Sequence, residues 1–75
     1  MSALPWAGRT ALVTGGTGFI GGALVTRLAE LGAKVTVPTR DRTRIGKSGH
    51  PHITYIPSAD MDQALGGVSA VFNLA

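Results

Sequence analysis

The sequence of 75 residues has no cysteine, which excludes disulfide bonds and thiolate metal sites. It also has no apolar run near the ~20 residues that cross a bilayer. Its first residues lack the basic segment and apolar core of a signal peptide. We therefore expect a soluble, cytoplasmic protein with no membrane partner. A chain of this size buries only roughly 60 to 65 % of its unfolded surface, so its stability alone would be marginal.

The side chains that most often bind metals are also scarce. The chain has two histidines, His50 and His52, which flank a proline. No third ligand stands near them in the sequence, and their spacing does not place both on one face of a helix. We therefore expect no metal site.

Glycine, in contrast, is concentrated in one informative segment. Gly16-Thr-Gly18-Phe-Ile-Gly21 has the spacing G-x-G-x-x-G, and Gly15, Gly18 and Gly21 also fit G-x-x-G-x-x-G. An apolar run precedes the glycines and a helical apolar pattern follows, which is the context that the motif requires. Gly21 is not followed by the Lys and Ser/Thr of a P-loop. The turn predicts binding of a pyrophosphate against backbone N–H groups at a helix N-terminus.

Hydrophobic periodicity and turn residues predict the remaining elements. The helix ends at Gly32, Pro38 closes the second strand, and Asp60 with Gln63 resembles a capping box. Residues 39–52 show no helical period and are predicted as a long crossover loop. The expected elements are strands at 10–14, 34–37, 53–56 and 70–74, and helices at 18–31 and 61–65.

This order of elements predicts an α/β fold with parallel strands and right-handed crossovers. Residues 1–75 would form the N-terminal part of a Rossmann-type doubly wound parallel sheet, β-α-β-loop-β-α-β, cut after the fourth strand. The expected strand order is 3-2-1-4. The fourth run, with Val71, Phe72 and Leu74, would then lie at an apolar sheet edge. We expect a missing C-terminal portion, or a second copy of the chain, to complete the sheet.

The segment Val13-Thr-Gly-Gly-Thr-Gly-Phe-Ile-Gly21 resembles the short-chain dehydrogenase/reductase superfamily, and within it the extended and atypical branch, the NAD-dependent epimerase/dehydratase family. The resemblance implies that Asp60 contacts the adenine amino group. It also implies that Asn73-Leu74-Ala75 ends the fourth strand beside the nicotinamide ribose. The pyrophosphate contacts that it implies are Gly15, Gly18, Phe19, Ile20 and Gly21.

Cofactor preference depends on the end of the second strand, where an NAD site places a carboxylate for the ribose hydroxyls. Counting the family pattern through Gly32 puts Thr39 at that position, followed by Arg40. An arginine can hold a 2′-phosphate with two hydrogen bonds, so Arg40, helped by Arg42 or Arg44, favours NADP over NAD. Asp41 is the alternative, because a shift of one residue would restore an NAD-like acid.

The catalytic Tyr-x-x-x-Lys pair of the resembled family is not found in this sequence. Tyr55 is the only tyrosine, it has no lysine four positions on, and no lysine follows Lys47. We therefore assign no catalytic residue. Two interpretations stay open: the dinucleotide-binding portion of an oxidoreductase, epimerase or dehydratase, or a non-catalytic NAD(P)-binding sensor or regulator.

Four of the seven basic residues fall between positions 40 and 47. Such a run can be a solvated loop, a phosphate-binding loop or a nucleic-acid patch. No aromatic residue lies within it, so it lacks the stacking platforms of single-strand binders. We expect no nucleic-acid partner.

Overall fold

The computed structural model describes residues 5–15, 18–45 and 50–74. Its strands form one parallel sheet in the order β3-β2-β1-β4, which confirms the predicted fold and strand order. The elements are β1 (Thr10–Thr14), α1 (Phe19–Glu30), β2 (Lys34–Thr39), β3 (Ile53–Pro57), α2 (Met61–Ala64) and β4 (Ala70–Asn73), with 3₁₀-helices at Arg42–Arg44, Ser58–Asp60 and Leu65–Gly67.

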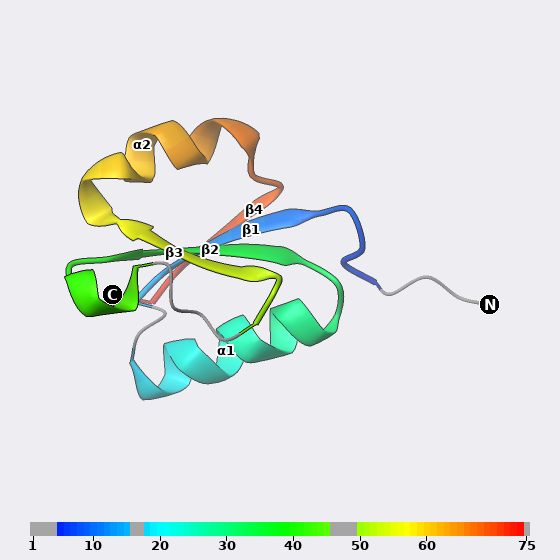
Figure 1. Cartoon of the computed structure of the whole chain (residues 1–75). Coiled ribbons are helices and arrows are strands. Elements are labelled where there is room, and N and C mark those ends of the chain that lie inside the picture. Colours follow the sequence, from blue (N-terminus) through cyan, green and yellow to red (C-terminus); the bar gives the residue numbers. More distant parts are fainter. Residues whose placement is uncertain (1–4, 16–17, 46–49, 75) are drawn as a thin grey trace.

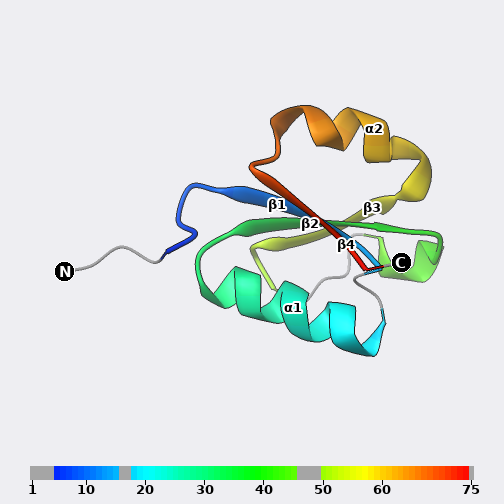
Figure 2. The ribbon, with the colours of Figure 1, turned by 180° about the vertical axis from the view of Figure 1, so that it is seen from behind.

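The two helices lie on opposite faces of the sheet (Figures 1 and 2). α1 packs its buried residues Val25, Leu28 and Ala29 against β1 and β2. The spacing i, i+3, i+4 places these three residues on one side of the helix. The segment with α2 covers the other face more thinly, since neither α2 nor its flanking 3₁₀-helices contain a buried residue.

β1 is the most deeply buried strand of the described chain. Ala11, Leu12 and Val13 have no exposed surface, because β1 is paired on both edges and covered on both faces. Ala11 and Val13 belong to the core cluster under α1. Leu12 lies between them and, by the alternation of a strand, faces the side of α2. This burial explains the continuous apolar run that predicted the strand.

α1 ends at a glycine, as expected. Gly32 has φ = 100°, a conformation that favours glycine, and its N–H bonds the carbonyl of Ala29 at 3.1 Å. The chain then reverses directly into β2. This short connection sets β2 beside β1 in parallel register, with Thr10 opposite Lys34.

Pro38 does not close the second strand, so that prediction was wrong by two residues. β2 continues to Thr39, and Pro38 pairs with Ile56 of β3. The N–H of Lys34 points to β1 and that of Val35 points to β3, so position 38 has its nitrogen on the β1 side. Pairing with β1 ends at Thr36, and the missing N–H of Pro38 therefore breaks no ladder bond.

Two further local expectations differ from the structure. The crossover predicted as loop contains a 3₁₀-helix at Arg42–Arg44. The capping box at Asp60 is absent, because Asp60 makes no side-chain cap bond. The 3₁₀-helix Ser58–Asp60 runs directly into α2, and the N–H of Met61 donates a hydrogen bond to the carbonyl of Ser58. Asp60 thus lacks the extended backbone of an N-cap residue.

The described residues before β1 pack against the rest of the fold. Trp6 packs against Phe72 of β4 with 6.1 Å between ring centroids, and the Arg9 guanidinium lies 5.8 Å from the Trp6 ring. The N–H of Trp6 donates to the carbonyl of Leu31 at 2.9 Å. Residues before β1 therefore connect the end of α1 to β4.

β4 is an edge strand within the part of the chain that the structure describes, where it pairs only with β1. Val71 on this strand is 49 % exposed, and Leu74, just past its end, is 44 % exposed. None of the described helices has the length and apolar character needed to cross a membrane.

Candidate functional site

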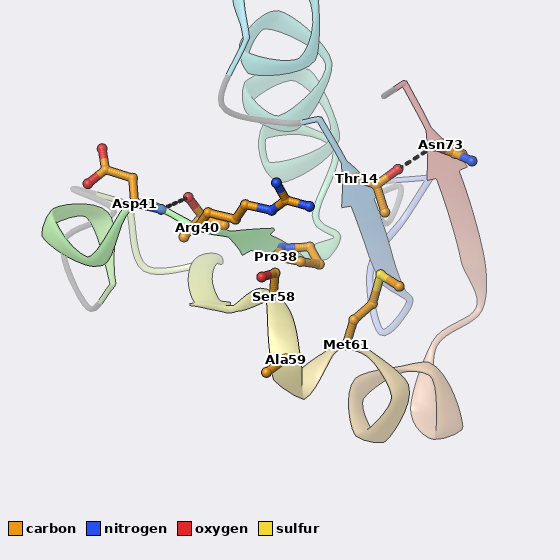
Figure 3. Close-up of a pocket in the computed structure, with 9 residues that line it drawn as sticks. Thr14, Pro38, Arg40, Asp41, Ser58, Ala59, Met61 and Asn73 are labelled. Carbon is orange, nitrogen blue, oxygen red and sulfur yellow. Dashed lines mark hydrogen bonds between the residues drawn. The ribbon is translucent and has the colours of Figure 1, made fainter.

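A cleft of about 800 Å³ opens at the carboxyl ends of β1, β2 and β4 (Figure 3). In the strand order 3-2-1-4 the chain changes direction between β1 and β4, so this edge is the topological switch point where doubly wound sheets bind ligands. Its volume lies within the range of small-molecule sites. The lining residues are Thr14, Pro38, Thr39, Arg40, Asp41, Ser58, Ala59, Met61 and Asn73.

The glycine turn leaves β1 at this same edge. Gly15 has φ = 77°, in the left-handed region that favours glycine, and its carbonyl accepts the N–H of Gly18 at 3.1 Å. Gly18 is the N-cap of α1, and its carbonyl accepts the N–H of Gly22 at 2.7 Å. The turn therefore places the N-terminus of α1 next to the end of β1.

The N-terminus of α1 has the properties of an anion site. The N–H groups of a first helical turn have no acceptor within the helix, and the helix dipole adds positive potential there. The first turn of α1 contains no acidic residue that would oppose an anion. A methyl group added at Gly18 would lie 3.5 Å from the Gly15 carbonyl oxygen, in ordinary contact. Among the described residues, the fold therefore leaves room for a methyl group at Gly18.

Side chains join the ends of β1 and β4. The Thr14 hydroxyl lies 2.7 Å from the Asn73 Oδ1 oxygen, its closest acceptor, and 3.4 Å from the Phe72 carbonyl. The N–H of Leu74 donates to the Thr14 carbonyl at 3.0 Å. These bonds hold the polar groups of Thr14 and Asn73 at the wall of the cleft (Figure 3).

The end of β2 forms the opposite wall. Thr39 is 6 % exposed, and its Oγ1 accepts the N–H of Asp41 at 3.0 Å. Arg40 is exposed, and its guanidinium extends across the cleft toward Thr14 (Figure 3). The Asp41 carboxylate points the other way, away from that guanidinium. The positive side chain thus faces the cleft, and the neighbouring negative side chain faces away from it.

The Asp41 carboxylate is held by the turn that follows it. Its Oδ1 accepts two hydrogen bonds from Thr43, from the hydroxyl at 2.6 Å and from the N–H at 3.0 Å. Arg44 Nε lies 3.6 Å from its Oδ2. The hydrogen bond from the Thr43 hydroxyl, then that from the Thr43 N–H, and then the charge of Arg44 lower the pKa of Asp41 below its ordinary value of 3.8.

Three of the predicted site residues line the cleft together: Thr39, Arg40 and Asn73. Asp60 does not line it, although its neighbours Ala59 and Met61 do. Leu74 lies past the end of β4 and is 44 % exposed. Gly15 and Gly18 form the turn, Phe19, Ile20 and Gly21 begin α1, and Ala75 lies outside the described residues.

Sequence reasoning missed the floor of the cleft. Ser58, Ala59 and Met61 were not predicted as site residues, yet all three line the cleft. A usable signal was present, because each follows the carboxyl end of a parallel strand, where such sheets place their sites. Thr14 ends β1 and carries the same signal.

The remaining candidates for chemistry lie elsewhere. Tyr55 sits in β3, half-buried, and packs against the core under α1. The His52 N–H donates to the Nδ1 of His50 at 3.0 Å, and the two rings meet edge to face. Over residues 5–15, 18–45 and 50–74, no group of three His, Cys, Asp or Glu side chains is placed to hold a metal.

Known proteins resemble this chain in sequence and structure. The model of the NAD dependent epimerase/dehydratase family matches residues 11–75. Two epimerase family proteins from strains of Staphylococcus epidermidis are each 48 % identical over 46 residues, which are 60 % of this chain and 14 % of theirs.

Solved structures of the Bordetella bronchiseptica enzyme WbmF share the fold. The complex with NAD+ and UDP has a TM-score of 0.69 and 31 % identity, over 99 % of this chain and 25 % of that chain. The complex with NADH has the same TM-score and identity, over 24 % of that chain. This chain therefore spans a quarter or less of the length of these relatives.

The lowered pKa of Asp41 predicts an acid transition in the turn 41–44. Because the folded pKa lies below the unfolded one, the stabilisation by these hydrogen bonds is present above about pH 4 and is lost as the pH falls through the folded pKa. The amide proton of Thr43, followed by NMR, should shift with a midpoint below 3.8. The shift should disappear in Asp41→Asn. A midpoint at or above 3.8 would contradict the hydrogen-bond pattern.

Proposed function

Because the chain belongs to the NAD dependent epimerase/dehydratase family, we propose that its cleft binds a nicotinamide dinucleotide. The observation that carries the proposal is the glycine turn, which brings the N-terminus of α1 to the switch point of the sheet beside a cleft of about 800 Å³. The structural neighbour WbmF is described in complexes with NAD+ and NADH, which supports this class of ligand.

The parts of a dinucleotide correspond to separate parts of the cleft. The pyrophosphate belongs at Gly15, Gly18 and the first turn of α1, where N–H groups and the helix dipole favour negative charge. The adenosine ribose belongs at the end of β2, with Arg40. The nicotinamide ribose belongs at the end of β4, with Asn73.

The side chains at the end of β2 favour NADP over NAD. Arg40 presents its guanidinium to the cleft, whereas the Asp41 carboxylate is held on the turn by Thr43. A guanidinium binds a 2′-phosphate through charge-assisted hydrogen bonds, and a carboxylate in its place would repel that phosphate.

The whole protein would then be an oxidoreductase, epimerase or dehydratase. The bound nicotinamide would supply hydride transfer, and this chain would bind and orient it. A second candidate is a non-catalytic dinucleotide sensor or regulator. Tyr55, the only tyrosine of this chain, packs on the core and does not line the cleft, so it is assigned no catalytic role. A Tyr-x-x-x-Lys pair in the parent protein, beyond the residues of this chain, would favour the enzyme.

Replacing Gly18 tests the pyrophosphate site. In Gly18→Ala the added methyl meets, among the described residues, the Gly15 oxygen at 3.5 Å, so the free energy of unfolding should change by about 1 kcal/mol or less. Binding of NADPH should weaken by roughly tenfold or more, because this position lets the backbone approach the pyrophosphate. Calorimetry measures the affinity, and urea unfolding followed by circular dichroism measures the stability.

Gly66→Ala is the matched control. A Cβ at Gly66 would have no neighbour within 4 Å, and Gly66 is not part of the cleft. It should leave the affinity unchanged. If Gly18→Ala and Gly66→Ala bind NADPH with equal affinity, the proposal that the pyrophosphate binds at this turn is contradicted.

Replacing Arg40 tests the cofactor preference. The unmodified chain should bind NADPH more tightly than NADH. Arg40→Ala should lower the affinity for NADPH by about tenfold and leave that for NADH nearly unchanged, since only NADPH has the 2′-phosphate. The control Arg27→Ala removes an equal charge from an exposed side chain near the other end of α1. Equal affinity of the unmodified chain for both nucleotides would contradict the preference.

We also propose that a further strand covers the edge of β4, supplied by a C-terminal portion of the protein or by a second copy. The support is the exposed apolar edge, where Val71 is 49 % and Leu74 is 44 % exposed. Analytical ultracentrifugation of the 75-residue chain should show self-association. A stable, well-folded monomer at high concentration would contradict this proposal.

A further inference from the structure

The turn after β2 determines which of two neighbouring, oppositely charged side chains faces the cleft. Arg40 and Asp41 are adjacent, and both line the cleft. Only the Arg40 guanidinium is directed across it, while the Asp41 carboxylate points away (Figure 3). Arg40 and Asp41 directly follow β2, so which of the two side chains faces the cleft depends on the conformation of this turn.

Hydrogen bonds with two threonines hold Asp41 in this orientation. The buried Thr39 hydroxyl oxygen accepts the backbone N–H of Asp41, which sets the direction of the main chain. Thr43 then donates two hydrogen bonds to the Asp41 Oδ1, at 2.6 and 3.0 Å. Arg44 adds an ion pair at 3.6 Å between half-exposed groups, and such surface pairs contribute little.

We propose that Thr43 is a specificity-determining positioning residue, whose hydroxyl holds the Asp41 carboxylate away from the adenosine ribose so that Arg40 alone faces the 2′ position. The inference rests on the proposed function. Thr43 does not line the cleft and acts only through Asp41. Released from Thr43, Asp41 can turn toward the ribose, where it repels a 2′-phosphate and accepts hydrogen bonds from ribose hydroxyls.

Thr43→Val tests this role, because valine matches the shape of threonine and lacks only the hydroxyl. The ratio of NADPH affinity to NADH affinity, measured by calorimetry on the full chain, should fall by about fivefold. Thr43→Ser keeps a hydroxyl and should restore the ratio. Thr54→Val makes the same replacement at an exposed residue of β3 and should leave the ratio unchanged.

A double variant separates positioning from a general structural effect. With Asp41→Ala in place, adding Thr43→Val should not change the ratio, because no carboxylate is left to release. If Thr43→Val lowers both affinities equally, or leaves the ratio unchanged while both nucleotides bind, the inference is overturned and the proposed function stands. If the unmodified chain binds neither nucleotide, the proposed function fails and the inference fails with it.

Discussion

β1 is the strand on which the other elements depend. It is paired on both edges, by β2 and β4, and Ala11, Leu12 and Val13 have no exposed surface. Its carboxyl end leads directly into the glycine turn, so the position of β1 sets the position of the helix N-terminus. Thr14, the last residue of the strand, also bonds Asn73 on β4. The core and the cleft therefore share one element, with the apolar residues in its centre and the polar ones at its end.

In the proposed site, backbone and side chains would divide the recognition of a dinucleotide between them. The turn at Gly15 and Gly18 offers N–H groups and a helix dipole, which suit a diphosphate irrespective of the rest of the ligand. The end of β2 offers the Arg40 guanidinium, which would distinguish a 2′-phosphate from a hydroxyl, and the restrained Asp41. The main-chain groups at the turn are positioned by the fold, whereas the groups at the end of β2 are set by the identity of single side chains.

Most of the fold could be predicted from the sequence, because strong local signals agreed with the global topology. The apolar run of β1, the glycine after α1 and the short connections determine a parallel sheet in the order that is observed. The errors came from features that only tertiary contacts decide. Pro38 remains within β2 because β1 has already stopped pairing there. Asp60 forms no cap because a 3₁₀-helix precedes it.

The site was less predictable than the fold for the same reason. Thr39 and Arg40 were predicted by counting the family pattern to the end of the second strand, and Asn73 from the family resemblance. The structure brings all three to one cleft. Met61 was missed because an apolar residue on a short helix has no pattern that separates a cleft from a core. The direction of Asp41 was not predicted either, although an Asp that accepts the N–H two residues on is a known local pattern.

Membership of the family does not decide between NAD and NADP, because that preference depends on the side chains at the end of β2. The family match covers residues 11–75, and the glycine turn and strand order that it includes concern the diphosphate and the sheet rather than the 2′ position. A neighbour such as WbmF, at 31 % identity, can share these features and still differ at the ribose. The presence of an acid near the end of β2 is not sufficient evidence for NAD either. The deciding quantity is whether that acid faces the ligand, and here Asp41 is turned away by its own following residues.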